Sequence, residues 1–140
     1  MQHFVNGFLF SADRTRVALI HKNRPAWQAG RINGIGGKVE AGEENIDAMA
    51  REFAEEAGVT LPPDAWHPFA TLSGEGFVIH FYRAFSDRID EARTVETEEV
   101  AIYPVDDLPK EVLPNLRWLI PMALDEKIDL REPVQIAEVQ

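Results

Sequence analysis

A glycine-rich stretch that runs directly into an acidic, amphipathic segment, residues 36–59, constrains the fold of this chain more than any other feature. The spacing of its apolar residues predicts a helix over Glu44–Ala57. The buried stripe of this helix is expected to consist of Ile46, Met49, Ala50, Phe53 and Ala57. Gly58 follows at the position where a left-handed residue commonly ends a helix. The segment therefore predicts one well-bounded helix with one buried face.

Three glutamates, Glu52, Glu55 and Glu56, fall on a second arc of this helix that is roughly 100° wide. Like charges at this spacing repel each other, and the negative end of the helix dipole disfavours them further. Three hard oxygen ligands are, however, what Mg²⁺ or Mn²⁺ binds, with water and substrate phosphates completing the shell. Because the glycines of NGIGGK allow a close backbone approach, the segment predicts cations held against a phosphorylated ligand. A solvated acidic surface is the alternative.

The rest of the chain predicts strands on both sides of this helix and a second helix near the C-terminus. The expected strands are Phe4–Phe10, Arg16–Lys22, His67–Ser73, Gly76–Phe85 and Val100–Val105, with an edge strand in the tail, residues 132–140. Residues 23–38, rich in Gly, Pro and Asn, predict a loop. The second helix is expected over Pro114–Asp125, with a kink at Pro121. With 140 residues, this order predicts a single domain over residues 1–140 of the α/β (α+β) class.

Composition excludes several classes of function. A net charge of −10 argues against a long nucleic acid as partner, because a phosphate backbone needs a basic surface. The absence of cysteine excludes disulfides and thiolate metal sites, and no two of the four histidines have metal-ligand spacing. No apolar run reaches about 18 residues, so no membrane span is expected. The N-terminal residues do not resemble a signal peptide, so the expected location is cytoplasmic.

Residues 37–59 resemble the Nudix box. That pattern is a Gly, five residues, a Glu, seven residues and then REUxEExGU, where U is a bulky apolar residue. Its fixed positions are filled here by Gly37, Glu43, Arg51, Glu52, Phe53, Glu55, Glu56, Gly58 and Val59. Phe53 is aromatic where an aliphatic residue is commoner. The resemblance implies a three-layered α/β/α sandwich with a mixed β-sheet, and hydrolysis of a nucleoside diphosphate linked to another group with the help of Mg²⁺ or Mn²⁺.

The resemblance also implies roles for single residues. Glu52, Glu55 and Glu56 would be metal ligands together with the carbonyl of Gly36 or Gly37, and Glu52 or Glu56 would also orient or deprotonate water. Arg51 would brace the site by pairing with Glu43, although a helical pair with Glu55 is a further possibility. A later carboxylate often completes the site; the candidates are Glu96, Glu98 and Glu99, of which Glu99 is favoured.

The stretch GRINGIGGKVEAGE is similar to the corresponding part of the MutT-like branch, which hydrolyses nucleoside triphosphates with oxidised purines. This similarity implies that Asn33 hydrogen-bonds the base and Trp27 packs against it, unless Asn33 is a turn former and Trp27 covers the core. Lys38 and Arg24 are candidate phosphate contacts. The pattern that closes the base pocket in that branch is a Trp and two adjacent acids, which are replaced here by Leu113, Asn115 and Leu116. Asn115 is thus a candidate substrate contact, whereas Trp118 is expected to anchor the second helix in the core.

The implied activity is cleavage of a nucleoside triphosphate, or of an oxidised nucleotide, to the monophosphate and pyrophosphate by a monomer or homodimer. Alternatives are hydrolysis of ADP-ribose, another nucleotide sugar or a dinucleoside polyphosphate, and a non-catalytic nucleotide-binding regulator. The intact REUxEE pattern argues against the regulator. The 36 residues before the box leave little room for the additional N-terminal sheet common in ADP-ribose hydrolases.

Overall fold

A mixed sheet of eight strands forms the centre of the molecule in the computed structural model, which describes residues 1–128 and 131–139. Its two longest strands, β1 (Gln2–Phe10) and β6 (Phe77–Phe85), run parallel to each other. Antiparallel neighbours lie on either side of this pair, β2 (Arg16–His21) beside β1 and β5 (His67–Gly74) beside β6. β7 (Val100–Pro104) pairs with β2, and β8 (Val134–Ala137) adds a parallel edge strand to β5.

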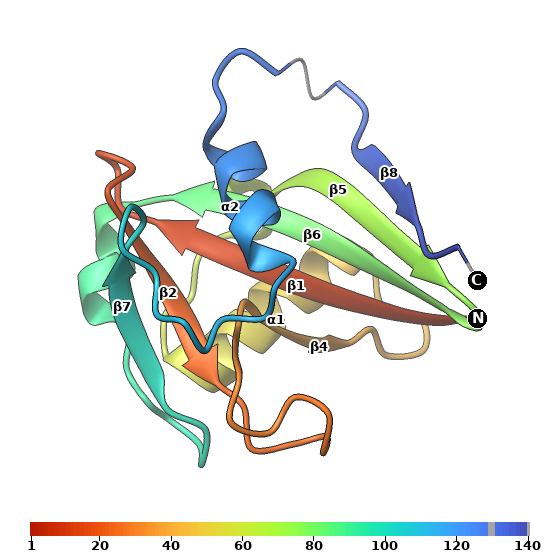
Figure 1. Ribbon diagram of the computed structural model, residues 1–140, viewed down its shortest axis with the longest axis horizontal. Helices are drawn as coiled ribbons and strands as arrows, with labels where there is room; N and C mark the ends of the chain where they lie inside the picture. Colours follow the sequence, from red (N-terminus) through yellow and green to blue (C-terminus); the bar gives the residue numbers. More distant parts are fainter. Residues whose placement is uncertain (129–130, 140) are drawn as a thin grey trace.

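Helices cover the sheet on its two faces, α1 (Asn45–Ala57) on one and α2 (Leu116–Leu124) on the other (Figure 1). β1 supplies side chains to both interfaces because successive residues of a strand point to opposite faces. Val5 and Leu9 belong to the core under α1, whereas Phe8 and Phe10 belong to the core under α2. The predicted α/β/α sandwich with a mixed sheet is therefore confirmed.

The first helix begins and ends close to the predicted residues. Met49, Phe53 and Ala57 are fully buried as predicted, together with Ala48, and the rest of the expected stripe, Ile46 and Ala50, is partly buried against the same core. Gly58 has a φ of 73°, and its N–H donates to the carbonyl of Ala54, so it ends the helix as expected. The remaining predicted strands are confirmed within a few residues, and Gln140 of the predicted tail lies outside the described residues.

The prediction of a continuous loop over residues 23–38 is wrong at its C-terminal end. Residues 32–38 form two short strands, β3 (Ile32–Asn33) beside β2 and β4 (Ile35–Lys38) antiparallel to β1. A Cβ atom on Gly36 would lie 1.8 Å from the carbonyl oxygen of Val5, so only glycine lets β4 approach β1 this closely. The glycines that suggested a loop are therefore the residues that permit a strand.

The second helix differs from the prediction in its start and in the position of its tryptophan. It begins at Leu116, two residues after the predicted Pro114, and Pro121 lies inside it. Its buried stripe consists of Leu116, Leu119, Ile120 and Ala123. Trp118 lies off this stripe and is 42% exposed, so the prediction that it anchors the core is wrong. Two 3₁₀ turns that were not predicted, η1 (Pro63–Ala65) and η2 (Asp87–Glu91), complete the described elements.

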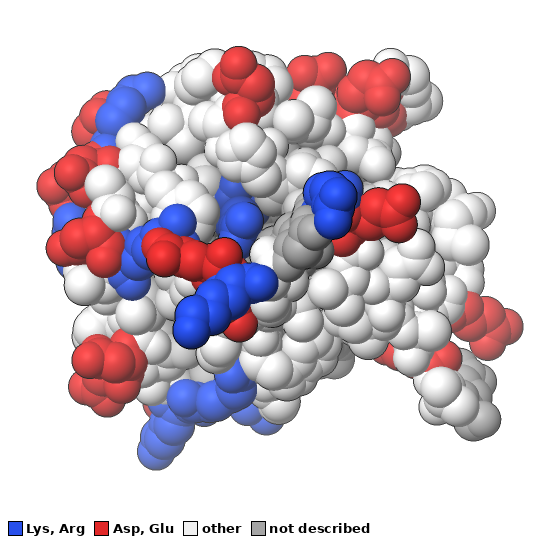
Figure 2. Space-filling model, turned by 90° about the horizontal axis from the view of Figure 1, so that it is seen from above, with Lys and Arg blue, Asp and Glu red and all other residues white. Residues whose placement is uncertain are grey.

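The surface carries charges of both signs. On the face drawn in Figure 2, Lys and Arg side chains lie among Asp and Glu side chains rather than in one continuous basic area. Among the residues that the structure describes, no helix combines the length and the apolar character needed to cross a lipid bilayer.

Candidate active site

The acidic arc of α1 faces the glycine-rich strand β4, so the sheet and the helix together form one end of a cavity. Glu52 and Glu56 line this cavity with the backbone of Gly36 and Gly37. The side chain of Glu52 is 14% exposed and that of Glu55 is 52% exposed, so the three glutamates are unequal in their access to water. A Cβ atom on Gly37 would lie 2.6 Å from the Glu52 carboxylate, so this strand position needs glycine as well.

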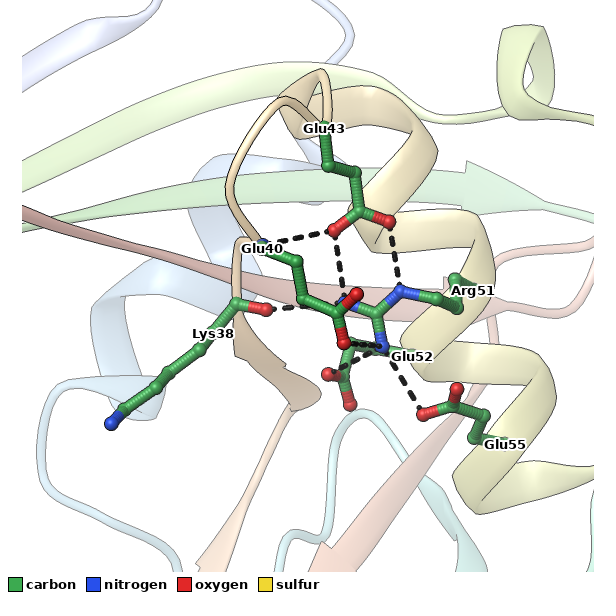
Figure 3. Close-up of polar contacts among 6 residues, drawn as sticks. All are labelled: Lys38, Glu40, Glu43, Arg51, Glu52 and Glu55. Carbon is green, nitrogen blue, oxygen red and sulfur yellow. Dashed lines mark hydrogen bonds and ion pairs between the residues drawn. The ribbon is translucent and has the colours of Figure 1, made fainter.

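Arg51 holds the acidic residues around the start and the middle of α1 together (Figure 3). Its guanidinium donates two hydrogen bonds to Glu43, with Nε–Oε2 and Nη2–Oε1 distances of 2.8 and 3.0 Å. Nη1 lies 3.0 Å from Glu52 Oε1 and 3.2 Å from Glu55 Oε2, and Nη2 donates to the carbonyl of Lys38. Arg51 therefore makes both the contact with Glu43 and the helical contact with Glu55 that the sequence suggested.

Burial raises the pKa of both glutamates that line the cavity. It raises the pKa of Glu56 to about 7, with the neighbouring charge of Glu52 acting in the same direction and Lys22 opposing it. Burial also raises the pKa of Glu52, although Arg51 opposes this shift. Glu56 Oε2 is buried and has no hydrogen-bond partner in the protein. The site thus contains a buried carboxylate whose ionised form is only partly stabilised, by the charge of Lys22.

Of the three later candidates, Glu98 lines the cavity, whereas Glu96 and Glu99 do not. Glu98 accepts hydrogen bonds from Lys22 Nζ at 2.9 Å and from the N–H of Asn23 at 2.6 Å. Burial alone would raise the pKa of Glu98, but these contacts outweigh it and leave the pKa below its usual value. Glu99 is exposed, and its carboxylate lies 3.7 Å from His21 Nε2. The geometry therefore favours Glu98 where the sequence favoured Glu99, while Glu96 is exposed as well.

The cavity has a volume of about 1260 Å³ and extends from the glutamates to an apolar and amide-lined end. All five predicted substrate contacts line it, namely Arg24, Trp27, Asn33, Lys38 and Asn115. Trp27 is 70% exposed, so it lies at the rim and does not cover the core. Aromatic and aliphatic side chains of the central strands form part of the lining, among them Phe4, Leu72 and Ile79.

Several polar residues that line the cavity were not predicted from the sequence, among them Asn6 and Lys22. Asn6 could have been noticed because it is a lone amide in the apolar run FVNGFLF, and a polar residue in a buried strand is informative. Lys22 carried no comparable signal, because a lysine at the end of a strand is usually a solvated charge.

The residues at the acidic end fit a divalent cation in their chemistry. Carboxylate oxygens and glycine carbonyls are the ligands that Mg²⁺ and Mn²⁺ prefer, and the orphaned Glu56 oxygen lies among them. As they stand, the His, Asp and Glu side chains in residues 1–128 and 131–139 do not form a group of three or more that could hold an ion. Arg51 engages Glu52 and Glu55 instead. A cation at this end would therefore compete with the Arg51 guanidinium for these carboxylates.

An acidic helix against a glycine-rich strand, at one end of a cavity of about 1260 Å³, is an arrangement that can hold a phosphorylated ligand through a divalent cation. The NUDIX domain profile matches residues 2–122, and the chain belongs to this family. It is accordingly a hydrolase that acts on phosphoric anhydride bonds, and the family generally uses divalent metal cations.

The comparisons with single proteins agree with this assignment. The chain is 34% identical to the oxidized purine nucleoside triphosphate hydrolase of Mus musculus over 80% of this chain and 74% of that protein. It is 31% identical to the Danio rerio protein of the same name over the same shares. Among solved structures, a MutT from a study of Aliivibrio salmonicida and Vibrio cholerae superimposes with a TM-score of 0.72 at 25% identity, covering 87% of this chain and 96% of that one. A MutT NUDIX hydrolase from Burkholderia pseudomallei superimposes with a TM-score of 0.68 at 26% identity, and the match covers 87% of this chain and 98% of that one.

Proposed function

We propose that this chain hydrolyses nucleoside triphosphates, including those with oxidised purines, to the monophosphate and pyrophosphate with Mg²⁺ or Mn²⁺. One observation carries the proposal: the acidic end and the amide-lined end belong to the same cavity. A nucleotide has two matching ends: an anionic phosphate chain, which a cation at the acidic end would bind, and an aromatic base with hydrogen-bonding groups, which suits the amide-lined end. The substrates named for the relatives in mouse and zebrafish support the purine class.

Each part of the cavity has a role in this proposal. Glu52, Glu55 and Glu56, with the carbonyl of Gly36 or Gly37, would hold the cation. When bound, the cation supplies positive charge that neutralises the phosphates and activates water. Arg51, held by its two hydrogen bonds to Glu43, would stay beside Glu52 and Glu55, and Glu98 would hold Lys22 at the same end of the cavity.

The proton from the attacking water needs an acceptor near neutral pH, and Glu56 is suited to this role. It lines the cavity, and its Oε2 has no hydrogen-bond partner in the protein that would compete for the proton. Lys22, which is held by Glu98 2.9 Å away, points a cation into the same end of the cavity. Arg24 and Lys38 line the cavity as further phosphate contacts, and Trp27 offers a stacking surface at its rim.

A substrate panel with product analysis tests this function. Deoxynucleoside and nucleoside triphosphates, their 8-oxopurine forms, ADP-ribose and dinucleoside polyphosphates are each incubated with Mg²⁺ and with Mn²⁺. We expect monophosphate and pyrophosphate from the triphosphates, and no product in excess chelator. Release of orthophosphate instead, or faster cleavage of ADP-ribose or a dinucleoside polyphosphate than of any triphosphate, would overturn the proposal.

A further inference from the structure

Two histidines that are distant in the sequence meet on the face of the sheet that α1 covers. His3 lies on β1 and His80 lies on β6, 77 residues further along the chain. Both share this face with Val5 and Tyr82, the second residues after them, which belong to the core under α1. His3 is exposed and His80 is half-buried, and neither lines the cavity of the candidate active site. The pair is therefore a separate feature of the molecule.

The two imidazole rings face each other through one nitrogen atom each. His3 Nδ1 lies 2.9 Å from His80 Nε2, the ring planes are inclined by 12°, and the ring centroids are 5.2 Å apart. Because the centroids are farther apart than the nitrogens by about two ring radii, the rings lie edge to edge rather than one above the other. A hydrogen bond between two such nitrogens needs one N–H and one lone pair, so the rings share one proton.

This hydrogen bond is not required to hold the two strands together. β1 and β6 pair in parallel along their whole lengths, from Gln2 opposite Phe77 to Phe10 opposite Phe85. An exposed hydrogen bond between side chains adds little to such a ladder, because water competes for both groups. The arrangement of the two rings therefore calls for an explanation other than strand pairing.

Two imidazole nitrogens at this separation suit a transition-metal ion. Imidazole binds Cu²⁺, Ni²⁺ and Zn²⁺, whereas Mg²⁺ prefers oxygen ligands. With metal–nitrogen bonds of about 2.0–2.1 Å, nitrogens 2.9 Å apart subtend an angle of about 90° at the ion. Neighbouring ligands have this angle in the square-planar or tetragonal sites of Cu²⁺ and Ni²⁺, whereas the tetrahedral sites of Zn²⁺ need a wider one. The spacing therefore favours Cu²⁺ and Ni²⁺.

Protonation does not prevent metal binding at neutral pH. Burial lowers the pKa of His80, and the neighbouring His3 lowers it further, so this ring is neutral at pH 7 and above. To free both lone pairs, the shared proton moves through solvent to the other nitrogen of its own ring, and both rings turn toward the ion. The exposure of His3 leaves room for this rotation.

A pocket beside His3 has room for the remaining ligands of such an ion. Its volume is about 410 Å³, and its lining includes Gln2, Glu40, Glu43 and Asn45. Water, or a carboxylate or amino group of a small ligand, can complete the coordination from this side. The two glutamates also make the pocket electrically favourable for a cation.

We propose that His3 and His80 form a binding site for Cu²⁺ or Ni²⁺, with water completing the coordination. The site goes beyond the proposed hydrolysis of nucleotides, because it takes a different class of metal ion through nitrogen ligands and lies outside the cavity. The spacing of the histidines in the sequence does not indicate it, since only the parallel pairing of β1 with β6 brings the two side chains together.

Calorimetric titration with Ni²⁺ tests the site, in an excess of Mg²⁺ that occupies sites made of oxygen ligands. The proteins compared are the wild type, His3→Gln, His80→Gln and the matched control His67→Gln, which removes an exposed histidine of β5. Electron paramagnetic resonance of each protein with an equimolar amount of Cu²⁺ is the second measurement, because nitrogen ligands split the signal of this ion. Neither measurement depends on hydrolysis.

We expect a single Ni²⁺ to bind to the wild type and to His67→Gln with the same affinity. Binding should be at least about tenfold weaker in His3→Gln and in His80→Gln, since even the loss of an outer-shell partner weakens metal binding by about 10–100-fold. The Cu²⁺ signal should show two imidazole nitrogens in the wild type and fewer in either variant. Melting temperatures without metal show whether each variant is folded, and His80→Asn replaces His80→Gln if the latter does not fold.

Three results would overturn the inference, and none of them bears on the proposed function. The first is a wild type that does not bind Ni²⁺ under these conditions. The second is an equal affinity in all four proteins, which would show adventitious binding to carboxylates of the acidic surface. The third is a loss in His3→Gln that is absent from His80→Gln, which would show that His3 binds the ion with backbone groups near the N-terminus and not as a pair with His80.

Discussion

Glu56 combines burial, an unpaired oxygen and a position beside Glu52, and its charge is costly to the fold for all three reasons. Glu56→Gln keeps the size of the side chain and removes the charge. We expect kcat/KM to fall at least about a hundredfold, or roughly 2.7 kcal/mol of transition-state stabilisation, with an unchanged circular dichroism spectrum. Glu75→Gln, in the exposed turn between β5 and β6, should leave the rate unchanged. An equal loss of folding and activity would show that Glu56 is structural.

The same group predicts how stability depends on pH in the metal-free protein. The pKa of Glu56 is raised from 4.5 to about 7 in the folded chain, so between these values the folded state binds more protons than the unfolded state. The free energy of unfolding should therefore fall as the pH rises from about 4.5 to 7, by up to roughly 3 kcal/mol from this group. Denaturant titrations in excess chelator measure the effect, and Glu56→Gln should be less dependent on pH and more stable at pH 8. A variant that loses stability at pH 8 would contradict this.

Arg51 is the positively charged side chain that pairs with Glu43, Glu52 and Glu55. Arg51→Met keeps the aliphatic stem but leaves Glu43 and Glu52, both less than a fifth exposed, without a counter-charge. We expect a loss of about 2–3 kcal/mol in the free energy of unfolding at pH 7. Arg16→Met breaks the exposed pair with Asp90 and should cost less than about 1 kcal/mol. Equal losses in urea titrations of the two variants would show that Arg51 is an ordinary surface charge.

At the scale of elements, β4 depends on the absence of a side chain at Gly36. Gly36→Ala places a methyl group 1.8 Å from the carbonyl oxygen of Val5, and both positions belong to backbone that cannot move aside without breaking the β1–β4 pairing. We expect a loss of about 3 kcal/mol or more in stability and a large loss of activity, since β4 also forms the floor of the site. Gly42→Ala, with a φ of 79° but no atom within 4 Å, should cost about 1–2 kcal/mol. Comparable melting temperatures for the two variants would argue against this role of Gly36.

The elements that the sequence predicted are those in which one periodic pattern extends over many residues. α1 was predictable because its apolar stripe, its acids and Gly58 all indicate the same helix. β3 and β4 were not, because two to four residues rich in glycine carry no periodicity, and their pairing with β2 and β1 is decided by contacts distant in the sequence. Trp118 was misjudged because the size of a side chain says little about the side of a short helix on which it lies.

The predictability of the site follows the same division. The glutamates of α1 are close in sequence, so their spacing alone brought them together. The cavity, in contrast, joins residues from the first strand, the loop after β2, the segment before β7 and the start of α2. Glu98 and Glu99 are adjacent, and only the path of the chain between η2 and β7 decides which of the two enters the cavity.

At the scale of the whole molecule, the site links α1, β4 and the segment before β7, so binding of a cation should stabilise the entire fold. A ligand that binds only the folded state at 100 times its Kd adds about 2.7 kcal/mol. For a chain of 140 residues this corresponds to a rise in melting temperature of roughly 5–15 °C. Thermal unfolding is followed with Mg²⁺, with Mn²⁺ and with NaCl at matched ionic strength, because general screening of the net charge of −10 also stabilises the fold. We expect Mg²⁺ and Mn²⁺ to raise the melting temperature of the wild type and of Arg16→Met more than NaCl does. In Glu56→Gln, most of this additional rise should be lost. An excess that persists in Glu56→Gln would place the cation elsewhere on the acidic surface.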